Sequence, residues 1–118
     1  MVKLLIVEDD DDVRDALKQL LELDGYSVRT AASAEEATDI IRTHEPLCVI
    51  LDLCLPGLSG IDLAARLRAD FGTDLVMIVL TGSLDVEEHQ AAEAAGVDYV
   101  LRKPLDVDLF RRIVPPLH

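Results

Sequence analysis

Polar residues that could do chemistry follow directly on apolar runs at four separate places in this chain. They comprise three carboxylates, one hydroxyl and one amine: Glu8, Asp9, Asp52, Thr81 and Lys103. Carboxylate oxygens are the ligands that hard cations such as Mg²⁺ and Mn²⁺ prefer. A carboxylate can also attack phosphorus to give an aspartyl phosphate, whose oxygens an ammonium and a hydroxyl would hold. The set therefore indicates a phosphoryl-receiving site that contains Mg²⁺, with Mn²⁺ as a possible substitute.

The apolar runs that precede these residues explain how they could meet. The runs cover residues 4–7, 49–51, 76–80 and 100–101. Continuous apolar runs separated by helical periodicity are typical of parallel strands that are buried on both faces. The carboxyl ends of such strands lie at one edge of the sheet, where ligands bind in open α/β sheets. We therefore expect the five polar side chains to lie at one edge.

Strand and helix patterns alternate along the whole chain. We predict strands at about 4–7, 26–30, 47–52, 75–81 and 99–102, and helices at about 10–24, 33–45, 61–70, 85–95 and 106–114. Five such repeats predict a single domain over residues 1–118, an α/β doubly wound (βα)5 fold. A flavodoxin-like parallel sheet of order 2-1-3-4-5 fits five strands and places Glu8 and Asp9 beside Asp52.

Two of the predicted helices have informative apolar patterns. The first carries one stripe at helical spacing, formed by Val13, Ala16, Leu17, Leu20 and Leu21. The fourth, at 85–95, has only Val86 and alanines before Val97. A helix that buries so little apolar surface is expected to be weakly held and mobile.

The composition argues against several classes of function. The 118 residues include 23 acids and 11 bases, which gives a formal net charge of −12. Binding of nucleic acid is disfavoured, because phosphate contacts need clustered lysine and arginine. The longest apolar run is far shorter than the ~20 residues of a membrane span. The amino terminus has no signal-peptide pattern. We therefore expect a cytoplasmic domain that touches neither nucleic acid nor membrane.

Other acids and thiols have ordinary structural interpretations. Asp10, Asp11 and Asp12 are interpreted as residues that cap the first helix and complement its dipole. Cys48 is expected to be a small apolar residue of a buried strand. Two cysteines provide no disulfide framework.

Four segments together resemble the response-regulator receiver domains of two-component signalling, over essentially the whole chain. They are residues 5–10 (LIVEDD), 50–60 (ILDLCLPGLSG), 79–82 (VLTG) and 103–104 (KP). Each segment alone is a weak signal, but their combination is highly specific. The resemblance implies a phosphoprotein that acts as a signalling switch and is not a multiple-turnover enzyme.

The resemblance also assigns roles to individual residues. It implies that Asp52 is the phosphoacceptor and that Glu8 and Asp9 bind Mg²⁺ together with Asp52. Cys54 would add its backbone carbonyl to the metal site. Thr81 would bond the phosphoryl group and Lys103 would pair with it. The bond between Lys103 and Pro104 is expected to be cis.

The partners implied by the resemblance are a histidine kinase or a His-containing phosphotransfer protein as phosphodonor. An output domain or target protein would read a surface around the fourth helix, fifth strand and fifth helix. The cognate kinase, the output and a phosphorylation-dependent homodimer stay open.

Three positions depart from the usual receiver pattern. Val100 stands where receivers have a switch aromatic, and Tyr99 precedes it. Either the switch works without a rotating ring, or Tyr99 substitutes from a shifted strand end. Ser59 replaces a common Asp, a minor change at the start of the third helix, and Leu105 replaces a common Phe. The latter change is expected to loosen the packing of the last helix.

Two other functions compete with the phosphorylated switch. A haloacid-dehalogenase-like phosphatase also uses Asp and Mg²⁺, but such enzymes carry Asp-X-Asp after the first strand, whereas Asp52 follows the third strand and Cys54 supplies no second acid. A degenerate receiver would act as an unphosphorylated binding module. This alternative is disfavoured because every polar residue of the site is present.

Overall fold

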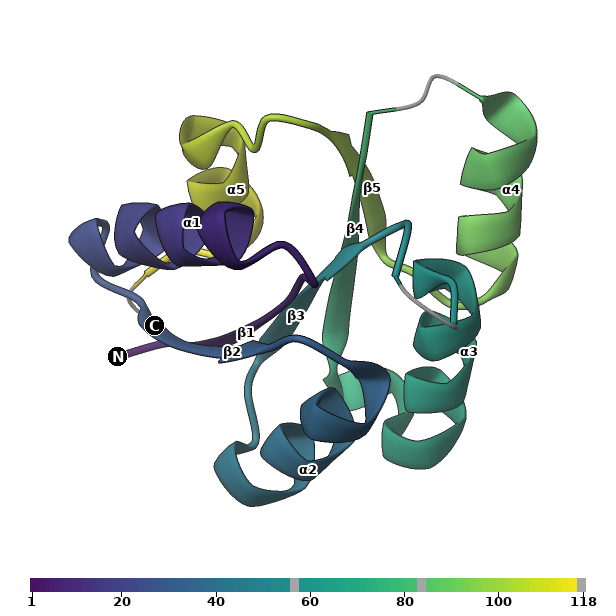
Figure 1. Cartoon of the computed structure of the whole chain (residues 1–118), viewed down its shortest axis with the longest axis horizontal. Helices are drawn as coiled ribbons and strands as arrows, with labels where there is room; N and C mark the ends of the chain where they lie inside the picture. Colours follow the sequence, from purple (N-terminus) through teal and green to yellow (C-terminus); the bar gives the residue numbers. More distant parts are fainter. Residues whose placement is uncertain (56–57, 83–84, 117–118) are drawn as a thin grey trace.

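A computed structural model describes residues 1–55, 58–82 and 85–116. Five parallel strands form one sheet in the order β2-β1-β3-β4-β5. The strands are β1 (Lys3–Val7), β2 (Ser27–Ala31), β3 (Cys48–Asp52), β4 (Val76–Thr81) and β5 (Tyr99–Arg102). The predicted fold class and strand order are confirmed (Figure 1).

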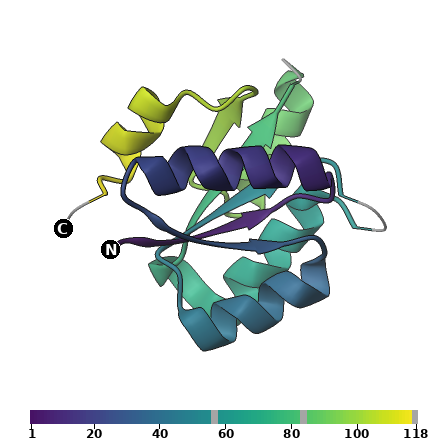
Figure 2. The same cartoon turned by 60° about the vertical axis from the view of Figure 1, so that its left-hand side comes forward.

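Helices cover both faces of this sheet. They are α1 (Asp11–Leu23), α2 (Ala34–His44), α3 (Gly60–Phe71), α4 (Val86–Ala94) and α5 (Val107–Ile113), with a short 3₁₀ turn, η1 (Gly72–Asp74), after α3. Figure 2 shows α1 and α5 on one side of the sheet and α2 on the other. Two buried clusters follow from this arrangement. One packs α2, α3 and α4 against the sheet, and the other packs α1 and α5.

The helix starts depend on side-chain caps that the sequence analysis recognised only in part. Asp10, Ser33, Ser59, Asp85 and Asp106 each accept a hydrogen bond from a backbone N–H of the following first turn. A cap satisfies a donor that has no partner within the helix. The predicted and observed bounds of each helix and strand differ by at most one residue at either end. The sequence Pro56-Gly57-Leu58-Ser59-Gly60 predicts a turn before α3, and Pro56 and Gly57 lie outside the described residues.

The apolar stripe of α1 is only partly covered. Leu21 is buried, whereas Val13 and Leu20 are 46% and 42% exposed. A groove of about 480 Å³ lies there, between α1 and the segment Lys103–Leu105. α5 has only seven residues, so it covers α1 at one end alone.

An aromatic contact in the second cluster lies between α5 and the segment that follows α1. The rings of Tyr26 and Phe110 pack edge to face with centroids 5.3 Å apart. The Tyr26 hydroxyl donates a hydrogen bond to the carbonyl of Val114, just beyond α5. This buried contact helps to hold the last helix on the sheet.

No helix among the described residues is long and apolar enough to cross a membrane.

Gly60 provides a stability test of how tightly the loop after β3 packs. A Cβ atom at this position would lie 2.2 Å from the carbonyl oxygen of Asp52 and 2.9 Å from Cα of Leu53. We predict that Gly60→Ala lowers the free energy of unfolding by about 1–3 kcal/mol, because backbone atoms must move to admit the methyl group. Gly82→Ala is the control, since nothing lies within 4 Å of its added Cβ. Equal urea midpoints for the two variants would contradict this packing.

Candidate metal and phosphoryl site

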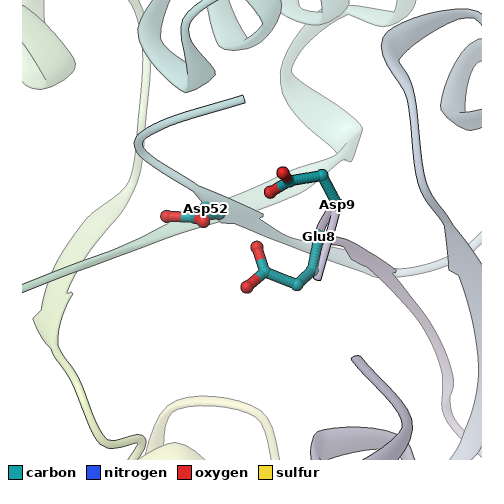
Figure 3. Close-up of side chains that lie close together, drawn as sticks. All are labelled: Glu8, Asp9 and Asp52. Atoms are coloured by element: carbon teal, nitrogen blue, oxygen red, sulfur yellow. The ribbon is translucent and has the colours of Figure 1, made fainter. Parts of the chain in front are cut away.

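The strand order brings three carboxylates together at the carboxyl edge of the sheet. β1 and β3 are neighbours, and Val7 pairs with Leu51, so Glu8 and Asp52 leave adjacent strand ends. The backbone N–H of Glu8 donates to the carbonyl of Ala31, which continues the β1–β2 pairing by one residue. One carboxylate oxygen from each of Glu8, Asp9 and Asp52 lies within 4.8 Å of the others (Figure 3).

The three carboxylates differ in their surroundings. Glu8 is only 5% exposed, and its Oε2 atom has no hydrogen-bond partner in the described part of the chain. Asp9 is exposed and Asp52 is half-buried. Oδ1 of Asp52 lies 3.0 Å from Nζ of Lys103 and accepts a 3.3 Å hydrogen bond from the N–H of Cys54. Lys103 therefore neutralises part of the charge, and the buried oxygen of Glu8 is left without compensation.

The pKa values express this imbalance. Burial, followed by the contact with Asp52, raises the pKa of Glu8 to about 7. Burial also acts to raise the pKa of Asp52, but hydrogen bonds involving Glu8 and Lys103 outweigh it and the net change is downward. The pKa of Lys103 is raised because its ion pair with Asp52 outweighs the effect of burial. Without a cation, the Glu8 carboxyl thus keeps its proton to a higher pH than an ordinary carboxyl, up to about pH 7, beside the ionised Asp52.

The donor set fits a hard divalent cation. All three side chains offer carboxylate oxygens, and within the described residues nothing donates a hydrogen bond to the buried Oε2 of Glu8, which leaves that oxygen available to a cation. Mg²⁺ and Mn²⁺ bind such oxygen donors in preference to nitrogen or sulfur. Cys54 follows Asp52 by two residues, and its thiol is exposed.

Thr81 and Lys103 reach the same edge from β4 and β5. Leu80 pairs with Asp52 in the β3–β4 register, and the buried Thr81 is the next residue. The backbone N–H of Lys103 donates to the carbonyl of Thr81 over 2.8 Å. The bond from Lys103 to Pro104 is cis. The side chains of Glu8, Asp9, Asp52 and Lys103 are thus brought together directly, and the backbone places Thr81 beside them.

The two candidate switch positions lie on opposite faces of β5. Val100 pairs with Val79 and packs against the same buried cluster, on the face that Thr81 also shares. Tyr99 pairs with Ile78 on the other face and is 44% exposed. In this register Tyr99 would need a shift of one residue to reach the face of Thr81.

Arg14 supports the site but was not singled out in the sequence. Its Nη1 atom donates to the backbone carbonyl of Glu8 over 3.0 Å, and its other terminal nitrogen pairs with Asp11. The guanidinium thereby fixes the turn between β1 and α1. The spacing of three residues between Asp11 and Arg14 could have indicated their ion pair. No pattern in the sequence indicated the contact of Arg14 with Glu8.

Comparison with known proteins identifies the family. The family model of the response regulator receiver domain matches residues 4–114. The response regulator MprA of Mycolicibacterium vanbaalenii is 38% identical over 97% of this chain and 52% of its own length. The chain thus spans about half the length of this curated relative. This chain belongs to the response regulator receiver domain family, and its class is a signalling domain of two-component systems.

Two solved structures extend the comparison. A putative response regulator from Chloroflexus aurantiacus has a TM-score of 0.85 and 38% identity, covering 95% of this chain and 93% of that one. A response regulator protein from Burkholderia pseudomallei has a TM-score of 0.85 and 30% identity, covering 93% and 64%. The latter structure contains a phosphorylated aspartic acid, a calcium ion and citrate.

The carboxylate cluster predicts stabilisation by Mg²⁺. A ligand that binds only the native state adds about 2.7 kcal/mol when its free concentration is a hundred times its Kd. We therefore expect the melting temperature to rise by several degrees in millimolar MgCl₂ relative to EDTA at matched ionic strength. Asp9→Asn should reduce this rise, because it removes an exposed ligand with little effect on packing. Superimposable melting curves with and without Mg²⁺ would refute the metal assignment.

Proposed function

We propose that this domain is a Mg²⁺-dependent phosphoacceptor switch in which Asp52 receives a phosphoryl group from a histidine kinase or a His-containing phosphotransfer protein. The observation that supports this most strongly is the position of the Asp52 carboxylate. It lies 3.0 Å from the Lys103 amine and belongs to a cluster with Glu8 and Asp9 that spans 4.8 Å. The phosphorylated aspartic acid in the Burkholderia pseudomallei relative supports the same chemistry.

Each residue of the site has a part in this proposal. The ionised Asp52 attacks phosphorus, an O–P bond forms, and the P–N bond to the donor histidine breaks. Lys103 pairs with the phosphoryl oxygens, and Thr81 donates its hydroxyl to one of them. Glu8, Asp9, Asp52 and the Cys54 carbonyl would hold the cation. Bound Mg²⁺, or Mn²⁺ in its place, would supply positive charge that offsets the charge on the transferred group.

The consequence of phosphorylation would be a changed partner surface. Thr81 ends β4 just before the segment that leads to α4, and α4 buries only Ala92 completely. A pull on Thr81 would therefore shift α4 and β5, and with them the surface that α5 continues. An output domain or target protein would read that surface, in the cytoplasm. A homodimer formed on phosphorylation is one form such a partner could take.

Acetyl phosphate provides a direct chemical test. Incubation of the wild-type chain with Mg²⁺ and acetyl phosphate is expected to add the mass of one phosphoryl group, whereas Asp52→Asn is expected to add none. Lys103→Ala should slow the labelling, because the phosphoryl charge loses its ammonium partner. Intact mass spectrometry measures the added mass in the wild type and in both variants. An unlabelled wild type would instead support the unphosphorylated binding module.

Sustained hydrolysis would point to a different function. Multiple turnover of an added phosphomonoester that is abolished in Asp52→Asn would indicate a phosphatase of the haloacid-dehalogenase-like kind. We expect at most single labelling of the chain and no such turnover.

The surface change can be followed by hydrogen exchange. We predict that beryllofluoride, a phosphoryl mimic, together with Mg²⁺ alters amide protection in α4 and β5 and leaves β1 and β3 unchanged. The reason is that α4 buries little apolar surface and β5 is an edge strand. Asp52→Asn with the same additions is the control. Equal protection of α4 and β5 with and without the mimic would contradict the proposed switch.

A further inference from the structure

Helix α4 is held unequally along its length. Ala92, near its carboxyl-terminal end, is its only fully buried residue. In its middle, Glu88 Oε2 and His89 Nε2 are buried atoms that have no hydrogen-bond partner among the described residues. Buried polar atoms that lack partners oppose packing, so the middle of α4 contributes little to its own attachment. The one completely buried contact of α4 therefore lies at its carboxyl-terminal end, at Ala92.

Arg68 of α3 supplies that attachment. Its guanidinium donates to the carbonyl of Gly96 from Nε over 3.1 Å and from Nη2 over 2.7 Å. Nη1 donates to the carbonyls of Gly72 and Leu75, each over 2.7 Å. Nη2 also pairs with Asp98 Oδ2 over 2.8 Å. One side chain thus joins the end of α3, the entry to β4 and the turn that follows α4.

The turn after α4 is shaped to receive this side chain. The Asp98 carboxylate accepts a hydrogen bond from the N–H of Met77, and the N–H of Asp98 donates to the carbonyl of Met77. Gly96 has a φ of +96°, and an added Cβ would lie 3.0 Å from Cγ of Arg68. The backbone there needs glycine both for its conformation and for the closeness of Arg68.

We infer that Arg68 is a positioning residue that fixes the carboxyl-terminal end of α4, so that α4 moves chiefly at its amino-terminal end. That end follows Thr81 and Gly82, which leave the phosphoryl site. The movement driven by phosphorylation rests on the proposed function. The fixing of the turn at residues 95–98 by Arg68 does not.

Hydrogen exchange on Arg68→Met tests the inference. Arg66→Met is the matched control, because Arg66 lies exposed on the same helix and has no ion pair among the described residues. We expect residues 93–98 of Arg68→Met to exchange at least about tenfold faster than those of Arg66→Met, without any phosphoryl mimic. In the wild type with beryllofluoride and Mg²⁺, we expect protection to change in 86–92 and to stay constant in 93–98.

A conservative variant separates positioning from simple loss of stability. Arg68→Lys can still reach one partner but cannot bridge three carbonyls and a carboxylate, so its exchange in 93–98 should be intermediate. If Arg68→Met does not fold, as judged by circular dichroism, the comparison of Arg68→Lys with Arg66→Lys decides the question.

Two results would overturn the inference. One is equal exchange of 93–98 in the Arg68 and Arg66 variants. The other is a wild type in which the mimic changes 93–98 as strongly as 86–92. Labelling of Arg68→Met by acetyl phosphate is expected to be normal, because Arg68 lies away from the site. A wild type that accepts no phosphoryl group refutes the proposed function, while the comparison without mimic still tests the role of Arg68.

Discussion

Electrostatic repulsion among three carboxylates at the ends of two neighbouring strands is the constraint on which the rest of this structure depends. Glu8 and Asp9 follow β1, and Asp52 ends β3, so the strand order itself forces the charges together. The single amine of Lys103 offsets the charge of Asp52 but leaves the buried oxygen of Glu8 unpaired. Such a cluster is tolerated when a cation binds the carboxylates and offsets their charge. The bound cation can then also attract an anionic group such as a phosphoryl group.

In the proposed switch, the surrounding elements would convert this local chemistry into a response at a distance. Residues on the side of β1 and β3 are anchored in two well-packed clusters, whereas α4 is attached mainly through Ala92 and the contacts of Arg68. Free energy supplied at the phosphoryl site would therefore be expressed where packing is weakest. In the observed register the aliphatic Val100 lies on the same sheet face as Thr81, and Tyr99 would need a shift of one residue to take that place.

Much of the fold and of the site could be predicted from the sequence, because both depend on local patterns. The apolar runs predicted where the strands lie. The polar residues after these runs predicted which side chains meet at the carboxyl edge of the sheet, namely Glu8, Asp9, Asp52 and Lys103. The contacts that arginine side chains make with backbone carbonyls could not be predicted in the same way. The contact of Arg14 with the Glu8 carbonyl, the four partners of Arg68 and the partly uncovered stripe of α1 all depend on tertiary geometry and on the shortness of α5.

The most direct test of the central claim is a crystal structure of the chain grown with Mg²⁺ and beryllofluoride. The account predicts beryllium bound to a carboxylate oxygen of Asp52, a metal ion ligated by Glu8, Asp9 and Asp52, and the Lys103 amine on a fluoride. A structure in which the metal contacts neither Glu8 nor Asp9, or in which beryllofluoride binds away from Asp52, would contradict it.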